Sequence, residues 1–329
     1  MMIAGDHARP PAHRPVAAPC CGPHSLGDVS SRAWALFAAV AVLWGTPYLL
    51  IKVAVDDGMS PTFLAWARCV IGAAVLLPFA WRSGALRGLA ARWKVLTVFS
   101  LIEIVLPWPL IGAGEQRVSS SLAAILIASV PLVVALLAMR FDASERPTGL
   151  RLLGMLVGLG GVVALLGIDV AGRTSELVGA LLVLLAAVGY AVGPMLIKLK
   201  LSGTSPLGTV TAALAISALV LAIPAAASVP SHAPSTDALL SVIGLGVACS
   251  AIAFVCFFAL IAEAGPSRAT IITYVNPVVA VALGVALLDE RLGPGAIAGL
   301  ALILAGSWLA TGGGIPGRRR PEPAAVTSG

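Results

Sequence analysis

The sequence carries few charges and none of the side-chain clusters that usually perform catalysis. Charged residues make up 11% of the 329, whereas a soluble domain carries about 25% because its surface must be hydrated. No phosphate-binding loop and no nucleophile beside a base occur, and the four histidines, His7, His13, His24 and His232, lie outside the long apolar runs. These absences argue against a soluble domain, a hydrolase, a zinc enzyme and direct use of ATP.

Cysteine is also scarce, with five residues in the chain. Three of them, Cys69, Cys249 and Cys256, lie within apolar runs, where a thiol behaves as a small hydrophobic group. Cys20 and Cys21 lie in a proline-rich tail, but no second group of ligands follows at a spacing that suits a metal. We therefore expect no disulfide framework, no metal site and no cofactor.

Apolar residues, by contrast, make up 59% of the chain and give a mean hydropathy of +0.99. A surface with so little charge is suited to lipid. The net charge of +6 comes from short basic clusters between apolar runs. Nucleic-acid-binding proteins instead carry a basic stripe, so no nucleic-acid partner is expected. The sequence predicts an all-α integral membrane protein whose main partner is the lipid bilayer.

Ten apolar runs have the roughly 17–25 residues that cross a bilayer as a helix. They are 33–55, 61–81, 94–114, 119–139, 149–167, 177–197, 206–228, 238–262, 267–288 and 292–312. The alternation typical of a membrane β-barrel strand is absent from them. Residues 1–32 contain five prolines and no apolar signal sequence, and we expect both this segment and residues 314–329 to be disordered tails.

Lysine and arginine are distributed unevenly over the connections between these runs. With the N-terminus in the cytoplasm, sixteen of the 21 fall on the cytoplasmic side, and only Arg117, Arg173 and Arg291 fall outside. Cytoplasmic connections are normally the ones enriched in these residues. The pattern predicts ten transmembrane helices in the cytoplasmic membrane, with both termini in the cytoplasm.

The two halves of the sequence match each other at a spacing of 145 or 146 residues. The matches include proline, lysine and a Glu-Arg pair: Pro131 with Pro277, Lys52 with Lys198, and Glu145-Arg146 with Glu290-Arg291. Five helices is an odd number, so the second copy must be inverted in the membrane, as in many secondary transporters. We therefore predict two inverted five-helix repeats, residues 33–167 and 177–313.

An ordered set of motifs runs through the same residues. It consists of Trp44-Gly45-Thr46-Pro47-Tyr48 with Ile51-Lys52, Pro61 with Arg68, Ser119 to Ala124 leading to Pro131, Glu145-Arg146, and then Pro277 with Asp289-Glu290-Arg291. This set resembles the drug/metabolite transporter superfamily, in particular its EamA-type ten-helix branch. The resemblance implies a central cavity between the repeats and movement of small metabolites without ATP. The second half departs from it, because Tyr190-Ala191 replaces Trp44-Gly45 and Ala213 stands about where Arg68 does.

The function favoured by this resemblance is a secondary transporter that exports a small metabolite by alternating access, and not an enzyme. A non-transporting membrane protein, such as a lipid-modifying enzyme or a sensor, is the alternative. Such an enzyme should show an acid–base or metal group near one membrane face, and the sequence has none. The sequence is compatible with proton coupling and with a homodimer, and it leaves the substrate open.

Ionisable side chains inside the spans are the first candidates for function, since a charge at the helix centre costs about 2.5–3.5 kcal/mol on translocon scales. Arg68 lies seven residues into its run, and Glu103 lies about nine residues into its own. Their depths allow a structural ion pair. The alternative is that Arg68 anchors substrate and Glu103 carries a coupling proton. Glu103 is interpreted as the only carboxylate deep inside a span.

The remaining candidates are polar or aromatic. Lys52, one turn from the end of its run, either reaches the interface or contacts substrate. Four aromatic residues are candidates to line a cavity, namely Trp44, Tyr48, Tyr190 and Tyr274, and packing at the membrane interface is the alternative for Tyr48. Asn276, the only asparagine of the chain, precedes Pro277 and either lines the cavity or joins helices. Close helix packing is expected of the glycines at Gly154, Gly158, Gly161, Gly299 and Gly306.

Overall fold

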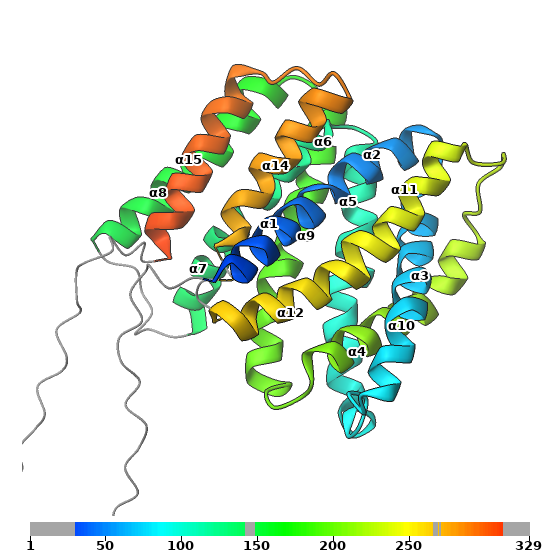
Figure 1. The fold of residues 1–329 in the computed structure, drawn as a ribbon. Coiled ribbons are helices and arrows are strands. Elements are labelled where there is room, and N and C mark those ends of the chain that lie inside the picture. Colours follow the sequence, from blue (N-terminus) through cyan, green and yellow to red (C-terminus); the bar gives the residue numbers. More distant parts are fainter. Residues whose placement is uncertain (1–29, 142–148, 266–268, 270, 312–329) are drawn as a thin grey trace, which may run out of the picture.

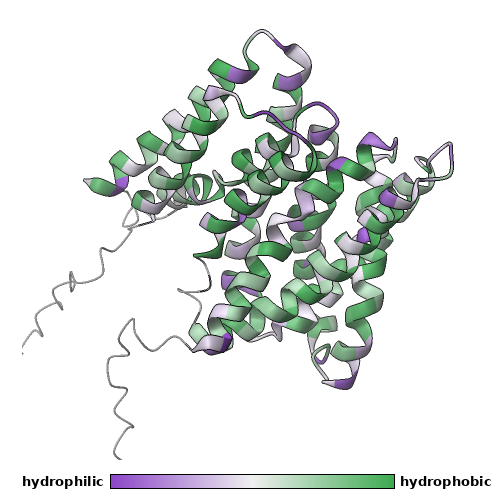
Figure 2. Ribbon diagram, turned by 45° about the horizontal axis from the view of Figure 1, so that its top comes forward, coloured by the Kyte–Doolittle hydropathy of each residue, from purple (hydrophilic) through white to green (hydrophobic). Residues whose placement is uncertain are grey.

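The computed structural model describes residues 30–141, 149–265, 269 and 271–311, and all regular structure in this part of the chain is helical (Figure 1). Within these described residues, eight helical segments are long and apolar enough to cross a membrane, and two further apolar helices are shorter. Hydrophilic residues gather mainly at helix ends and in connecting loops (Figure 2). The chain is therefore a multi-pass membrane protein. The predicted tails, Glu145-Arg146 and Arg268 lie outside the described residues.

The first half begins with two helices that meet at a proline, because Pro47 cannot continue the hydrogen bonding of the helix before it. Its elements are α1 (Ser31–Gly45), α2 (Pro47–Asp56), α3 (Pro61–Arg82), η1 (Leu89–Arg92), α4 (Trp93–Ser100), η2 (Leu101–Val105), α5 (Pro107–Glu115), α6 (Ser120–Ile127), α7 (Val130–Phe141), α8 (Leu150–Leu165) and η4 (Leu166–Val170). Each of the first five predicted runs contains helix.

The second half repeats this order with fewer interruptions. Its elements are α9 (Thr174–Lys200), α10 (Pro206–Ala226), α11 (Thr236–Gly246), η5 (Val247–Ile252), α12 (Ala253–Ala264), α14 (Ile272–Leu287) and α15 (Pro294–Ala310). The two shorter apolar helices are α14 and α15, and they occupy the predicted runs 267–288 and 292–312. The sequence therefore located the helices to within a few residues.

Corresponding helices of the two halves begin with the same chemistry. The Ser60 hydroxyl accepts a hydrogen bond from the Phe63 amide at 3.1 Å, and the Ser205 hydroxyl accepts one from the Gly208 amide at 3.4 Å. A proline follows each serine, and its missing N–H is tolerated in the first helical turn. These caps start α3 and α10.

The helices α3 and α10 pack against each other and run in opposite directions. The Ser60 hydroxyl at the start of α3 donates to the Ser228 carbonyl just beyond α10 at 2.8 Å. Further along α3, Gly72 faces Leu214, and beyond the end of α3 the Ala85 carbonyl lies against Gly208 in the first turn of α10. Residue numbers rise along one helix as they fall along the other.

The helices α8 and α15 form a second antiparallel pair, and they lie side by side at one edge of the molecule (Figure 1). A Cβ atom on Gly161 would lie 2.8 Å from Leu302 Cβ, and one on Gly154 would lie 2.6 Å from the Ala310 nitrogen. Only glycine permits this approach of two backbones. The packing role expected of these glycines is confirmed.

Several helix contacts of the first half recur between the corresponding helices of the second half. In the first half α3 packs on α5, and in the second half α10 packs on α12. The contact of α5 with α9 corresponds in the same way to the contacts of α12 with α1 and of α11 with α2. The contact of α1 with α14 corresponds to the contacts of α9 with α6 and α7. The two halves thus contribute equivalent surfaces to the bundle.

Two π-helical segments occupy corresponding places in the sequence. They are η2, which starts at Leu101, and η5, which starts at Val247, 146 residues later. A π-helical turn holds an extra residue, which rotates the side chains that follow it, and such turns are frequent at functional sites. Each lies inside a long apolar helical segment, Leu89–Glu115 for η2 and Thr236–Ala264 for η5.

Candidate functional site

Arg68 is a cation inside the helix bundle that joins the two halves. It lies on α3 and its side chain is buried, with 9% of the residue exposed. Its Nε atom donates to the Ser250 hydroxyl in η5 at 2.9 Å. That hydroxyl in turn donates to the Leu245 carbonyl at 2.8 Å, which fixes it as the acceptor for Arg68.

The indole of Trp108 supports the same guanidinium from one face. The Arg68 Cζ atom lies 3.7 Å from the centre of the Trp108 ring. Trp108 is buried in the first turn of α5, directly after η2 and Pro107. A cation over an indole face is stabilised by about 2 kcal/mol or more where water is excluded. Stacking occupies the face of the guanidinium and leaves its edges for hydrogen bonds.

The predicted ion pair between Arg68 and Glu103 does not form. Among the described residues the ion pairs are Arg32–Glu263, Lys52–Asp56 and Arg173–Glu176. The Arg68 side chain makes one hydrogen bond to the described residues, the one to Ser250. Its Nη1 and Nη2 atoms therefore have no hydrogen-bond partner among these residues. The sequence put Arg68 and Glu103 at similar depths in their spans. Depth alone does not give the direction in which a side chain points, so it did not show whether the two side chains meet.

Glu103 instead faces α9 from the middle of η2. Its Oε2 atom is buried and has no hydrogen-bond partner among the described residues. The carboxylate lies directly against Gly193, where an added Cβ atom would collide with Oε2. Gly193 therefore makes the space that Glu103 occupies, and no donor of the described residues is placed to stabilise the ionised carboxylate there.

The hydroxyl groups of Tyr48 and Tyr190 complete this group of side chains. Both interact electrostatically with Arg68. Tyr190 packs against the same apolar core as Trp108 and also interacts electrostatically with Glu103. Tyr48 is partly buried and packs against two of the apolar cores of the bundle.

Trp44 and Asn276 form a neighbouring group in which the second half supplies most partners. The ring of Trp44 lies 5.5 Å from Phe254 and 4.6 Å from Phe257. Tyr190 is 146 residues after Trp44, and Phe254 is 146 residues after Trp108. The Trp44–Phe254 contact therefore corresponds to the Tyr190–Trp108 contact. Asn276 keeps a buried Oδ1 without a partner in the described part of the chain.

Tyr274 lies apart from this group. Its hydroxyl is 2.8 Å from the Thr311 hydroxyl and donates to the Ser307 carbonyl at 3.4 Å. Those residues belong to the last turn of α15 and its cap. Tyr274 therefore fastens two helices of the second half, α14 and α15.

Lys52 is held by the protein. Its Nζ atom donates to the Asp56 carboxylate at 2.8 Å and to the Glu115 carbonyl at 2.9 Å. The side chain is 21% exposed, so it does not extend freely to the membrane interface. Lys52 links α2 to the end of α5.

Glu115 is a buried carboxylate that the sequence reasoning missed. It is fully buried, and neither carboxylate oxygen has a hydrogen-bond partner in the described ranges. Electrostatic interactions connect it with Lys52, Glu290, Asp56 and Tyr48. The predicted span 94–114 ended one residue before it, so this carboxylate at the end of α5 was not among the candidates.

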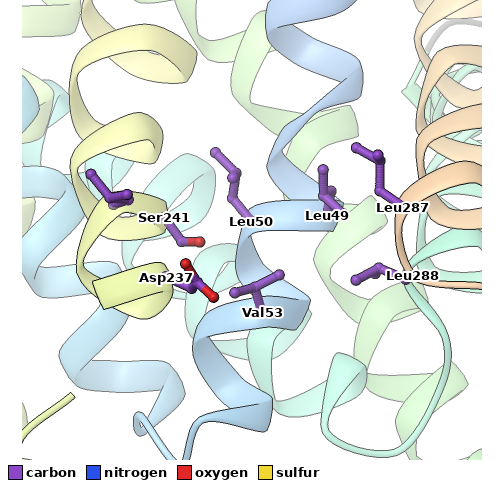
Figure 3. A pocket seen from close by; sticks show the side chains of 8 residues that line it. Leu49, Leu50, Val53, Asp237, Ser241, Leu287 and Leu288 are labelled. Carbon is purple, nitrogen blue, oxygen red and sulfur yellow. The ribbon is translucent and has the colours of Figure 1, made fainter. Parts of the chain in front are cut away.

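Two pockets open elsewhere on the bundle. One, of about 300 Å³, lies between α2, α11 and the end of α14 (Figure 3) and is lined by Leu49, Leu50, Val53, Asp237, Leu240, Ser241, Leu287 and Leu288. The other, of about 310 Å³, is lined by eleven residues that include Arg117, Arg173 and Arg291. Neither is lined by Arg68, Trp108, Glu103 or Tyr190, so these pockets do not reach the central group of side chains.

Comparison with known proteins gives a consistent result along the chain. The sequence profile of the EamA-like transporter family matches residues 32–167 and again residues 177–312. The chain is 30% identical over 264 residues to the uncharacterized inner membrane transporter YedA of Escherichia coli (strain K12), covering 78% of this chain and 83% of the other. It is 25% identical over 303 residues to the WAT1-related protein At3g02690, chloroplastic, of Arabidopsis thaliana, covering 87% and 70%.

A solved crystal structure is also similar in fold. It covers 86% of this chain and 98% of its own, with a TM-score of 0.61 and 23% identity. At this identity the likeness concerns the fold alone.

Proposed function

This chain belongs to the EamA-like transporter family, and on that premise we propose that it is a secondary transporter that exports a small metabolite across the cytoplasmic membrane. Alternating access is the proposed mechanism, with the substrate bound between the two halves. The observation that carries the proposal is the hydrogen bond between Arg68 and Ser250, which joins a buried cation of the first half to a π-helical segment of the second. We propose no catalytic step for the protein.

Ten transmembrane helices in two inverted repeats, 33–167 and 177–313, are part of this proposal. Four observations support them: the family profile matches twice, α3 and α8 pack antiparallel to their counterparts α10 and α15, several helix contacts of the first half recur in the second, and η2 and η5 start 146 residues apart. An inverted repeat lets the halves exchange conformations, so that one closed structure opens to either side.

The orientation proposed is N-inside and C-inside. Three arginines that this orientation puts on the outer face, Arg117, Arg173 and Arg291, line one pocket, which supports assigning them to the same side. The excess of lysine and arginine on the other connections follows the positive-inside rule.

In the proposed orientation, contacts between the two halves tie the outer ends of the helices together. Glu290 bonds the start of α6, Asp57 accepts from the Ser235 amide at 3.1 Å, and Asp169 accepts from the Ala296 amide at 2.6 Å. Each of these contacts joins the first half to the second. Opening toward the outside would have to break them, while Arg68 and Glu103 would be exposed first to one side and then to the other.

Substrate binding is proposed for Arg68 with Trp108, Tyr48 and Tyr190, and for Trp44 of the first half with Asn276 of the second. Glu103 is proposed as the group that carries a coupling proton, because it is buried at the same site without a fixed partner. Lys52 and Tyr274 are then parts of the scaffold. A homodimer remains a separate hypothesis that none of these contacts requires.

Metabolite profiling tests the transport function. Cells that lack the protein and cells that overproduce it are compared for metabolites inside the cell and in the medium. Export predicts that one small set of metabolites accumulates inside when the protein is missing and outside when it is abundant. A set that moves the opposite way would establish uptake, and no difference in either strain would contradict transport.

A further inference from the structure

We infer that the site around Arg68 binds a monocarboxylate that carries an apolar or aromatic body. This inference rests on the proposed transport function and adds to it the chemical class of the substrate. It starts from the geometry of one guanidinium and from the groups that surround it.

The guanidinium of Arg68 has a free edge. Its face is covered by Trp108 at 3.7 Å and its Nε atom is bonded to Ser250 at 2.9 Å. The remaining donors are those of Nη1 and Nη2, which point along one edge in a fixed plane. This edge matches the two oxygens of a carboxylate, which arginine binds through two parallel hydrogen bonds.

A buried cation without a counterion favours an anionic ligand. No carboxylate of the described residues lies in an ion pair with Arg68, and the residue is 9% exposed. Taking a charge out of water is costly unless it is paired. The cation–π contact offsets only a part of that cost, so a negatively charged substrate completes the site and a cation is repelled from it.

The charge of the site sets the charge of the ligand. The other deep basic side chain, Lys52, is already bonded to Asp56 and to the Glu115 carbonyl. One available cation matches one negative charge, and a phosphate dianion normally requires more donors. A ligand with a single carboxylate fits, whereas a nucleotide or a sugar phosphate would leave charge uncompensated.

The neighbours of Arg68 determine the rest of the ligand. They are largely aromatic or apolar, including Trp108, Tyr48, Tyr190 and the apolar core that contains Cys69 and Phe254. Two tyrosine hydroxyls add the few polar contacts. Such walls stabilise a flat or aliphatic body and offer little to a polyhydroxylated one.

Binding to the purified full-length protein tests the inference directly. Benzoate, benzamide and benzylamine share one ring and differ in the charged group, and each is titrated against the melting temperature of the wild type. We expect stabilisation by benzoate and none by the amide or the amine. Arg68→Lys keeps the charge but loses the planar fork, so the half-saturating benzoate concentration should rise at least about tenfold. Arg68→Gln should abolish the shift.

Arg173→Gln serves as the matched control, because it removes an arginine from an exposed ion pair. It should leave the benzoate titration unchanged. Equal stabilisation by benzamide, a benzoate shift that persists in Arg68→Gln, or no shift with benzoate at saturating concentrations would overturn the inference. If Arg68→Gln does not fold, the comparison of the three compounds on the wild type and Arg68→Lys decides.

The metabolite profiles separate this inference from the transport function. A protein-dependent set that consists of apolar or aromatic monocarboxylates supports both. A set of amines, sugars or phosphates overturns the monocarboxylate site while transport stands. No protein-dependent metabolite contradicts transport, and the inference falls with it.

Discussion

The Glu290 carboxylate holds the first turn of α6 through Ser121. One of its oxygens, Oε2, accepts from the Ser121 amide at 2.9 Å and from the Ser121 hydroxyl at 2.5 Å, while Oε1 accepts from the Ser120 amide at 2.7 Å. The first amides of a helix have no partner within the helix, and its positive end favours a carboxylate. A residue that follows α14 in the second half therefore caps a helix of the first.

Removing this cap should destabilise the protein. A hydrogen bond to a charged group contributes about 1.5–3 kcal/mol to stability, net of the hydrogen bonds to water that it replaces. We therefore expect Glu290→Ala to lower the free energy of unfolding by about 1–3 kcal/mol. Denaturant unfolding of the purified protein in detergent measures it. Glu176→Ala, which removes half of an exposed pair with Arg173, should cost less than about 1 kcal/mol. Equal effects of the two variants would contradict a specific cap.

Two adjacent glycines on α8 provide a matched test of the seam with α15. A Cβ atom on Gly161 would lie 2.8 Å from Leu302 Cβ and 3.0 Å from the Ile303 nitrogen, whereas one on Gly160 meets no atom within 4 Å. Gly161→Ala should therefore destabilise by about 1–3 kcal/mol through overpacking. Gly160→Ala should be neutral or gain up to about 1 kcal/mol from helix propensity. Melting temperatures measure both, and a larger loss for Gly160→Ala would refute the seam.

The bond between Asp57 and Ser235 predicts a pH dependence at the outer end. The Ser235 hydroxyl and then its backbone amide hold the pKa of Asp57 below its ordinary value of 3.8. A carboxylate whose pKa is lowered by folding stabilises the folded protein fully at pH values above its ordinary pKa. This stabilisation is lost as the pH falls below that value. The melting-temperature difference between wild type and Asp57→Ala should thus be constant between pH 5 and 8 and shrink below about pH 4. A difference that changes between pH 6 and 8 would show that another group controls this end.

Reporter fusions test the proposed topology. Reporters joined after Lys94, Lys200 and Arg318 should report the cytoplasm, and one near His232 should report the outside. The reason is that connections rich in lysine and arginine, which stay in the cytoplasm, alternate along the chain with connections that have few of them. His232 lies in the loop between α10 and α11. A cytoplasmic signal at His232 would contradict the orientation and the order of the spans.

The helices were predictable because their signals are local. Apolar runs end at charges and at Ser-Pro pairs, and these pairs do start α3 and α10. The glycines of α8 were predictable for the same reason, since a small residue at helical spacing has few roles other than close packing.

The site was only partly predictable because it depends on the direction of side chains. Glu103 lies in the π-helical segment η2, and Ser250, which bonds Arg68, lies in η5. A regular helical period does not show such a turn. Trp108 was missed although its match with Phe254 at a spacing of 146 residues was available. Glu115 was missed because the predicted span ended one residue before this buried carboxylate.

The last prediction concerns the proton-coupling role proposed for Glu103. Its carboxylate faces Gly193 without a hydrogen-bond partner among the described residues, and Tyr190 on the same helix α9 is the titratable group that interacts with it. Since Arg68 is bonded elsewhere, Glu103→Gln leaves no cation newly unpaired. The variant should therefore insert and fold like the wild type, with no need of a compensating change at Arg68.

Loss of charge at Glu103 should then appear in transport alone. In vesicles with an imposed pH gradient, Glu103→Gln should lose the dependence of the export rate on pH between about pH 5 and 8 while keeping exchange of substrate across the membrane. Glu115→Gln is the matched control, because it removes a second buried carboxylate in the outer network with Lys52. Gly193→Ala should imitate Glu103→Gln, since its methyl group would displace the carboxylate. Normal pH dependence in well-folded Glu103→Gln, combined with its loss in Glu115→Gln, would assign the coupling proton to Glu115 and exclude Glu103.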